Sequence, residues 1–477
     1  MAVLVLERSR SAARLNHRLN VIAIAQAALY MGITLYVLIE ADLPVYYLSN
    51  RYFFIDALGA YEAFISSIVF LLAAVYARGY VAGLLEHGEI DRGLLKLFYG
   101  SFGLLQVIIT CTFLTNNLAL FWIGLELTTI FSAILIVTLN AKDNIVAALK
   151  YLFVASTAML FSIIGLILIY ATSAQAGNGG TLNWDALMQQ SAGFPPSLFT
   201  LAFVFTFIGF AAKSGIVPFH TWLPPAHAKA PSVVSALLSA VLLNVGIYGI
   251  LRLYAIGYHT PSKDDISMVL FIFGGLTIVV AAFCMLPRTN IKKLIAYSSI
   301  EHMGLIIIGI GLGVRVAFFW VLFHLLGHAL IKTQLFFSTG ILGHQYGDNH
   351  IDRFKNAVVL QPLAVWGMII GGAAIIGTPL FPVFLSKLFI LIQIGDRSLW
   401  FLALVLVFLL LVAAAFAVFF IRAFTTTENA EAVLPYHAPW TMKAPVVLLL
   451  AATLVLGLYL PTALTNMIDE AVACLGF

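Results

Sequence analysis

The chain has 477 residues, of which 62% are hydrophobic and 10% are charged, and its formal net charge is +4. Soluble domains carry about 25% charged residues, so this composition excludes an ordinary soluble enzyme. Apolar stretches long enough to cross a bilayer recur from one end of the sequence to the other. We therefore expect an all-α polytopic membrane protein, and the small net charge gives no indication of nucleic-acid binding.

Thirteen candidate membrane spans follow one another along the chain. The first is preceded by "MAVLVLERSRSAARLNHRLN", which has no small-residue cleavage site, so we do not expect a removable signal peptide. Proline interrupts two of the later spans, at Pro218 and at Pro379 and Pro382. The candidate spans lie near 20–40, 57–80, 95–115, 117–139, 145–172, 197–223, 231–257, 266–286, 291–313, 315–342, 362–393, 398–425 and 441–465.

The lysines and arginines indicate an orientation. If the N-terminus is cytoplasmic, most of the 25 basic residues fall in loops on the cytoplasmic side. The opposite side then holds only Arg51, Arg252, Lys263, Arg315 and Arg397. Cytoplasmic loops of membrane proteins are enriched in basic residues, so we expect a multi-pass protein of the cytoplasmic membrane with its C-terminus outside.

Among the charged residues inside the predicted spans, three lysines and one glutamate stand out: Glu126, Lys213, Lys332 and Lys387. A charge at the bilayer centre costs roughly 2.5–3.5 kcal/mol on insertion scales, so such residues usually face a cavity or a partner. A buried ion pair or a side chain that reaches the interface is the simpler alternative. Four charges in separate spans, each far from the span ends, favour an ion path.

Two of these lysines lie in the interrupted spans, near the prolines. Lys213 precedes Pro218 by five residues in "FAAKSGIVPFHTWLPP", and Lys387 follows Pro382 by five residues in "GTPLFPVFLSKLFIL". Proline removes a backbone donor and opens the helix. Paired broken helices, one in each half of a chain, are typical of transporters built from inverted repeats. An ordinary proline kink is the alternative, but it does not explain the lysines.

The stretch "FHLLGHALIKTQLFF" places His324, His328 and Lys332 four residues apart. On a helix they lie along one face, each about 6 Å beyond the last. Histidine changes its protonation state near neutral pH, and a buried lysine can release its proton, so the three predict a proton relay. Metal binding by a histidine pair is the first alternative, but Lys332 would repel the ion and this helix offers no further carboxylate or cysteine ligand.

Redox and metal cofactors are not expected in this chain. Haem ligation by histidines on two helices would need a second matching row of histidines. The three cysteines are too scattered for an iron–sulfur cluster, a zinc site or a disulfide framework. They are Cys111, Cys284 and Cys474.

Several motifs together carry a family resemblance. In order along residues 120–340 they are "LFWIGLELTT", "AAKSGIVPFHTWLPPAHAKAPSVVSALLS", "IKKLIAYSSIEHMGLIIIGIGLG" and "HLLGHALIKTQLFF", with the weaker "SKLFIL" beyond them. The sequence resembles the proton-translocating, antiporter-like subunits of respiratory complex I, multi-subunit sodium/proton antiporters and membrane-bound nickel–iron hydrogenases. The stretches "KYLFVASTAMLFSIIGLILIY" and "YSSIEHMG" are most similar to component F of the hydrogenase-4 and formate hydrogenlyase type.

The resemblance implies an arrangement of the chain and roles for its residues. Two inverted five-helix repeats would occupy 95–257 and 258–425, between N-terminal helices in 1–94 and a C-terminal helix in 426–477. Glu126 and Lys213 would tune the first half-channel, the row His324, His328 and Lys332 would connect it to the second, and Lys387 would gate the exit. Candidate accessory residues in the same motifs are His220, His227, Ser239, Asn244, Glu301 and His302.

The sequence also departs from the family pattern. Related subunits often have a lysine or histidine in the helix after the first broken one, where this chain offers only Ser239 and Asn244. Pro225 replaces the acid of the family's "TWLPDAH", and Asn290 replaces the aspartate before "KK". The connection between Lys213 and the histidine–lysine row is therefore expected to depend on weaker polar groups or water.

Function is expected to follow the family. The resemblance implies a proton-translocating, or sodium-translocating, subunit of a redox-driven membrane complex such as a nickel–iron hydrogenase or a complex I-like oxidoreductase. Its partners would be other membrane subunits and, through them, a soluble redox arm. A subunit of a stand-alone cation/proton antiporter, a membrane partner in inorganic-carbon uptake and a non-conducting scaffold are the alternatives.

Overall fold

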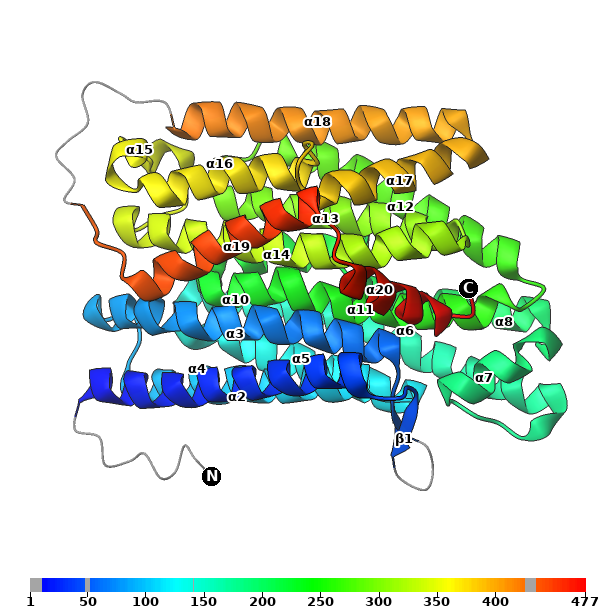
Figure 1. Cartoon of the computed structure of the whole chain (residues 1–477). Helices are drawn as coiled ribbons and strands as arrows, with labels where there is room; N and C mark the ends of the chain where they lie inside the picture. The colour runs from blue at the N-terminus through cyan, green and yellow to red at the C-terminus, as the bar shows by residue number, and fades with distance from the viewer. Residues whose placement is uncertain (1–10, 48–51, 140, 425–434) are drawn as a thin grey trace.

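The computed structural model describes residues 11–47, 52–139, 141–424 and 435–477, which form a bundle of helices lying side by side (Figure 1). Twelve helical segments of this part of the chain are long and apolar enough to cross a membrane, which confirms the prediction of an all-α, multi-pass protein. They are α2 (Ala12–Glu40), α3 (Ala57–Glu86), α4 (Arg92–Phe113), α5 with η1 (Leu118–Leu139), α6 with part of η2 (Lys142–Gly177), α8 (Pro196–Lys213), α10, η5 and α11 (Ser232–Tyr258), α12 (Lys263–Met285), α13 (Ile291–Gly311), α14 (Arg315–Tyr346), α18 (Leu399–Phe424) and α19 (Trp440–Leu458).

The predicted span 362–393 is divided between two shorter helices, α16 (Pro362–Ile376) and α17 (Pro382–Arg397). Each is shorter than the roughly 20 residues that a straight membrane helix needs. Helices therefore occupy every predicted span, but the count of thirteen membrane crossings and the two inverted repeats stay predictions.

Short elements connect the long helices. Strands β1 (Val45–Tyr47) and β2 (Phe53–Ile55) pair antiparallel, with Val45 opposite Ile55, in the connection from α2 to α3. The short helices are α7 (Trp184–Gln190), η3 (Ser191–Gly193), η4 (Phe219–Trp222), α9 (Leu223–Lys229), η6 (Ile351–Arg353), α15 (Ala357–Leu360) and α20 (Thr462–Ala473).

Burial rises from the edges of the bundle to its centre. Figure 1 shows α2 and α18 at opposite edges, with α14 between them. The apolar stretch of Ser232–Tyr258 is fully buried, and 94% of the apolar stretch of α13 is buried. In α18, by contrast, only 28% of the apolar stretch is buried. The central helices are thus enclosed by protein, and the edge helices present apolar side chains outward, as a lipid-facing surface requires.

The first break is a helix end closed by its own backbone. Helix α8 ends at Lys213, and Gly215 follows with a φ of +71°, a conformation that glycine adopts without strain. The amide of Gly215 donates to the carbonyl of Ala212, and that of Ile216 donates to Ala211. This pair of bonds is the Schellman motif, which satisfies carbonyls that a helix end would otherwise leave free.

The second break has the same construction. Helix α16 ends at Ile376, and Gly377 follows with a φ of +91°. The amide of Gly377 donates to Ala374, and that of Thr378 donates to Ala373. The two interrupted helices therefore end in the same motif, although their sequences differ.

The predicted prolines lie where these breaks occur. Pro218 directly precedes η4, Pro379 lies between α16 and α17, and Pro382 is the first residue of α17. At the first position of a helix proline costs no hydrogen bond, because that amide has no partner within the helix. The predicted interruptions are thus present in the structure.

The structure corrects the predicted position of one charge. Arg252, counted among the basic residues on the outer side of the membrane, lies within α11 and is 3% exposed. Its Nη2 atom lies 2.5 and 2.6 Å from the two carboxylate oxygens of Asp56, the residue that caps the start of α3. Arg252 is therefore a buried ion-pair partner between α3 and α11, and not one of the loop charges that indicate orientation.

Candidate functional site

The row His324, His328 and Lys332 lies on the buried α14 and faces its neighbours at the centre of the bundle. The Lys332 ammonium donates to the carbonyl of Ile295 at 2.9 Å and forms a hydrogen bond with Ser298. Both acceptors belong to α13. Because no surface is open to the amine here, Lys332 can exchange its proton only with groups inside the protein.

His302 of α13 joins the row to the second broken helix. Its Nδ1 lies 2.8 Å from Nε2 of His324, and its ring centre is 5.3 Å from that of His328. His324 in turn bonds through Nδ1 to the hydroxyl of Ser386 on α17, at 2.8 Å. An imidazole can donate at one nitrogen while it accepts at the other, so this series is suited to passing a proton along it.

Lys387 and Glu301 continue the series. The ammonium of Lys387 lies 3.1 Å from Oε1 of Glu301, and 3.5 Å from the carbonyl of Ile376 at the end of α16. The other carboxylate oxygen of Glu301 is 3.3 Å from Nε2 of His302. The predicted accessory residues Glu301 and His302 thus link Lys387 to the row on α14.

His227 approaches the other end of the row. It lies on α9, directly after the first broken helix, and its ring stacks on Phe336, four residues beyond Lys332, with centres 4.9 Å apart. Neither ring nitrogen of His227 or of His328 has a hydrogen-bond partner in the described part of the chain. Buried polar atoms of this kind are costly unless water satisfies them, so both rings mark places suited to internal water.

Lys213 lies in a separate polar cluster. Its ammonium donates to the hydroxyls of Thr129 on α5, at 2.8 Å, and Tyr151 on α6, at 2.9 Å. The Tyr151 hydroxyl also lies 3.0 Å from that of Ser132. Lys213 is 1% exposed and ends α8, so its charge also lies near the negative end of that helix's dipole.

Glu126 does not contact Lys213 in this conformation. Its Oε2 accepts a hydrogen bond from Ser156 of α6 at 3.1 Å, and no ion pair joins it to Lys213 among the described residues. Glu126 is only partly buried and lies on the outer face of the bundle, beside the exposed Ile123 and Ile130. The predicted pairing of Glu126 with Lys213 therefore stays a prediction about another conformation.

Of the two polar residues that stand where the family often has a lysine or histidine, Ser239 connects to the row on α14 and Asn244 does not. The hydroxyl of Ser239 lies 2.8 Å from that of Ser299, which donates at 3.3 Å to the carbonyl of Ile295 that also accepts from Lys332. Asn244 instead contacts Glu62 of α3. His220, by contrast, is half-buried on η4, and its Nδ1 has no partner in the described structure.

Glu62 is a buried carboxylate that the sequence alone did not single out. It lies in "DALGAYEAFISSIV" near the start of a predicted span, where an acid normally reaches the interface, and no basic residue stands near it in the sequence. In the structure it is 0% exposed. The signal that could have found it is an acid without any nearby basic residue in an otherwise apolar helix.

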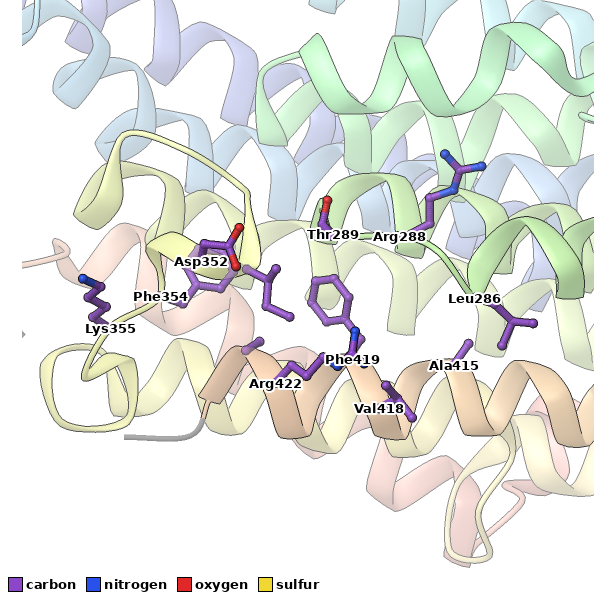
Figure 2. A pocket seen from close by; sticks show the side chains of 12 residues that line it. Leu286, Arg288, Thr289, Asp352, Phe354, Lys355, Ala415, Val418, Phe419 and Arg422 are labelled. Carbon is purple, nitrogen blue, oxygen red and sulfur yellow. The ribbon is translucent and has the colours of Figure 1, made fainter. Parts of the chain in front are cut away.

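The cavity in Figure 2 is separate from these groups. It has a volume of about 390 Å³ and lies between the turn after α12, the segment around η6 and the last turns of α18. Arg288, Lys355, Arg422 and Asp352 are among its twelve lining residues, which include no member of the polar series. It is a feature of the bundle edge and plays no part in the series described above.

Comparison with known proteins places this geometry in a family. Residues 115–416 match the family described as NADH:quinone oxidoreductase/Mrp antiporter, transmembrane. The chain belongs to this family. The matched range contains the whole polar series, Lys213 and Glu126, and the predicted resemblance to antiporter-like membrane subunits is confirmed.

Relatives within the NADH:quinone oxidoreductase/Mrp antiporter family cover most of the chain. It is 29% identical over 367 residues to a hydrogenase-4 component F homolog of Methylacidiphilum infernorum, which covers 76% of each chain. It is 27% identical over 424 residues to the N subunit of the NADH-quinone oxidoreductase of Desulforudis audaxviator, covering 84% of this chain and 80% of that one.

Solved structures share the fold of the whole chain. One is a membrane-bound sulfane sulfur reductase, described as an archaeal respiratory membrane complex, with a TM-score of 0.86 and 24% identity over 99% of this chain and 94% of that one. Another is the Mrp complex of a Dietzia species, with a TM-score of 0.83 and 20% identity over 99% of this chain and 95% of that one. At these identities the likeness establishes the fold alone.

Proposed function

We propose that this chain moves protons across the membrane as an antiporter-like subunit of a redox-driven membrane complex. The observation that carries the proposal is a buried series of titratable side chains on α13, α14 and α17, which crosses from one broken helix towards the other. The members of the series, in spatial order, are Lys387, Glu301, His302, His324, His328 and Lys332.

Protons fit this series better than sodium ions. A sodium ion needs several oxygen ligands, and positive lysines close to it would repel it. Along the series the one carboxylate, Glu301, is already paired with Lys387. Histidine and lysine hold and release protons, so the chemistry of the side chains favours a proton over a metal cation.

Each lysine has a distinct part in the proposal. Lys213 stores a proton in the first half of the chain, where Thr129 and Tyr151 hold its amine. The row on α14 passes protons between the halves, and Lys387 releases them when its pairing with Glu301 changes. Internal water beside His227 and His328 closes the remaining gaps.

The position of Glu126 indicates that the chain has partner subunits in the membrane. A carboxylate on the outer face of a membrane bundle is costly against lipid, so we expect a neighbouring membrane subunit to cover it. A relative named as a hydrogenase-4 component F homolog and one named as an NADH-quinone oxidoreductase subunit support such an assembly. In this proposal a soluble redox arm is the source of energy. The chain itself is proposed to hold no redox cofactor.

A cation/proton antiporter is the second candidate, because the Mrp complex of a Dietzia species has the same fold. The two functions differ in what drives transport. Membrane vesicles that contain the assembled complex decide between them: redox turnover acidifies the vesicles in the first case, and an imposed sodium gradient does so in the second. In either case Lys213→Ala should abolish the signal while the complex still assembles.

A further inference from the structure

A second line of polar side chains runs along α11, outside the series described above. Asn244, Tyr248 and Arg252 are four residues apart and so lie on one face of the helix. Arg252 donates to the hydroxyl of Tyr248 at 2.9 Å and pairs with Asp56 at the start of α3. The line therefore begins at the end of the bundle where α3 starts and leads inward along α11.

A π-helical turn extends this line by one more residue. Ser239 lies five positions before Asn244, a spacing that would turn it away from Asn244 on a regular α-helix. The turn η5 (Leu238–Leu242), which contains Ser239, takes up the extra residue. Ser239 therefore remains on the face of Asn244, and such turns often occur at functional positions.

Glu62 lies beside this line with an incomplete set of partners. Its Oε2 accepts from Nδ2 of Asn244 at 3.2 Å. Its Oε1 and the Oδ1 of Asn244 have no hydrogen-bond partner in the described part of the chain. Glu62 is fully buried, about 9 Å deeper along α3 than Asp56.

A purely structural acid at this depth would be expected to have a counter-charge. Asp56, one end of the same line, has Arg252 at hydrogen-bond distance. Glu62 forms no ion pair with any residue that the structure describes and has only an amide as its partner. An uncompensated buried carboxylate is costly, and it avoids that cost by binding a proton.

The inner end of the line reaches the row on α14. Ser239 bonds with Ser299, and Ser299 and Lys332 donate to the same carbonyl, that of Ile295. No direct bond among the described residues joins Tyr248 to Asn244, because the Tyr248 hydroxyl donates to the carbonyl of Phe113. The step between Asn244 and Ser239, about one helical turn, likewise has no direct bond to span it. The unpartnered Oδ1 of Asn244 offers a hydrogen-bond acceptor for a water at this step.

We propose that Glu62 is a proton-carrying group on an access route between Lys332 and the end of the bundle where α3 begins, near Asp56 and Arg252. This inference rests on the proposed proton translocation. In one step the Lys332 ammonium loses a proton to water beside Ser239, and the Glu62 carboxylate gains one from that water. Both side chains are then neutral. In the next step the neutral Glu62 releases its proton to water at the end of the bundle where α3 begins, and Lys332 regains one from the histidine row.

The test uses the assembled complex in membrane vesicles. Glu62→Gln keeps the size of the side chain and an acceptor for Asn244 but cannot carry a proton. It should lower proton pumping per assembled complex by at least about tenfold, since a positioned proton-transfer group contributes that much or more. Glu62→Asp keeps the carboxyl and should restore part of the pumping. Glu40→Gln, the same change at the exposed end of α2, should pump as wild type does.

A spectroscopic measurement gives a readout that a structural role would not move. In reduced-minus-oxidised infrared difference spectra, a carboxylic-acid C=O band should be present in the wild type and absent in Glu62→Gln. Wild-type pumping in Glu62→Gln, or an unchanged band, would overturn the inference. If Lys332→Arg also pumps normally, the proposed function itself has failed, whereas loss of pumping in Lys332→Arg alone would refute only the role of Glu62.

Discussion

At the scale of single residues, Lys213 is a buried lysine whose hydrogen-bond partners in the described structure are both hydroxyls. Two hydroxyls hold its amine, and no carboxylate lies within ion-pair distance of it among the described residues. Lys213→Ala should therefore abolish ion-coupled turnover, measured as acidification of vesicles, while leaving assembly largely intact. Lys229→Ala, which removes an exposed lysine paired with Asp143, is the matched control and should have little effect. Normal pumping in Lys213→Ala would exclude a central role for this lysine.

Variants of Glu126 test whether the charge or the packing of this side chain matters for Lys213. If the carboxylate attracts the ammonium in another conformation, Glu126→Gln removes the attraction and should impair pumping strongly. Glu126→Asp keeps the charge and should impair it less. Pumping rates normalised to assembled complex compare the two variants, and equal effects would count against an electrostatic role.

The ion pair between Glu301 and Lys387 carries both stability and function. Glu301→Gln leaves a buried lysine without its counter-charge and should cost roughly 3–5 kcal/mol of stability, seen as earlier thermal unfolding in detergent. The double variant Glu301→Gln with Lys387→Gln removes both charges and should recover much of that stability. Pumping should be lost in both variants, and recovery of pumping in the double variant would show that the pair is only structural.

At the scale of helices, the two breaks depend on their glycines. Gly215 and Gly377 have positive φ angles, so Gly215→Ala and Gly377→Ala should each cost about 1–2 kcal/mol. The added methyl at Gly377 would also come within 3.1 Å of the side chain of Lys387. Gly100→Ala in the middle of α4, where the methyl meets nothing within 4 Å, should be neutral or stabilising. Unfolding of the purified chain in detergent measures all three.

The sequence predicts features that lie within one helix. The row His324, His328 and Lys332 follows from the helical repeat, and the breaks follow from proline. The contact of His302 with His324 could not be derived in this way, because it depends on how α13 packs on α14. The isolation of Glu126 from Lys213 and the burial of Glu62 likewise depend on packing between helices far apart in the chain.

At the scale of the whole molecule, the polar groups concentrate where burial is highest. The series lies on the enclosed α13 and α14 and on α17, while the apolar surfaces of α2 and α18 face outward at the two edges (Figure 1). Because the charged groups of this series are separated from lipid in this way, the chain can hold several titratable residues within the membrane without exposing them to the bilayer.

The orientation in the membrane has its own test. A reporter fused to the C-terminus should be active only outside the cytoplasm, and one inserted in the connection 343–361 only inside it, because basic residues favour the cytoplasmic side. The opposite pair of results would mean that the number of crossings before residue 57 has been miscounted. Two reporters on the same side would contradict the predicted passage of 362–393 through the membrane.

The most direct test of proton translocation is pumping by Lys332→Arg in membrane vesicles, normalised to assembled complex. Arginine keeps the positive charge but does not release a proton under physiological conditions. His324→Gln is the companion variant, since it keeps hydrogen bonding and loses the titratable ring. We predict that both variants assemble and that both lose most of the pumping. Wild-type pumping by Lys332→Arg would contradict the account and show that the buried row on α14 is structural.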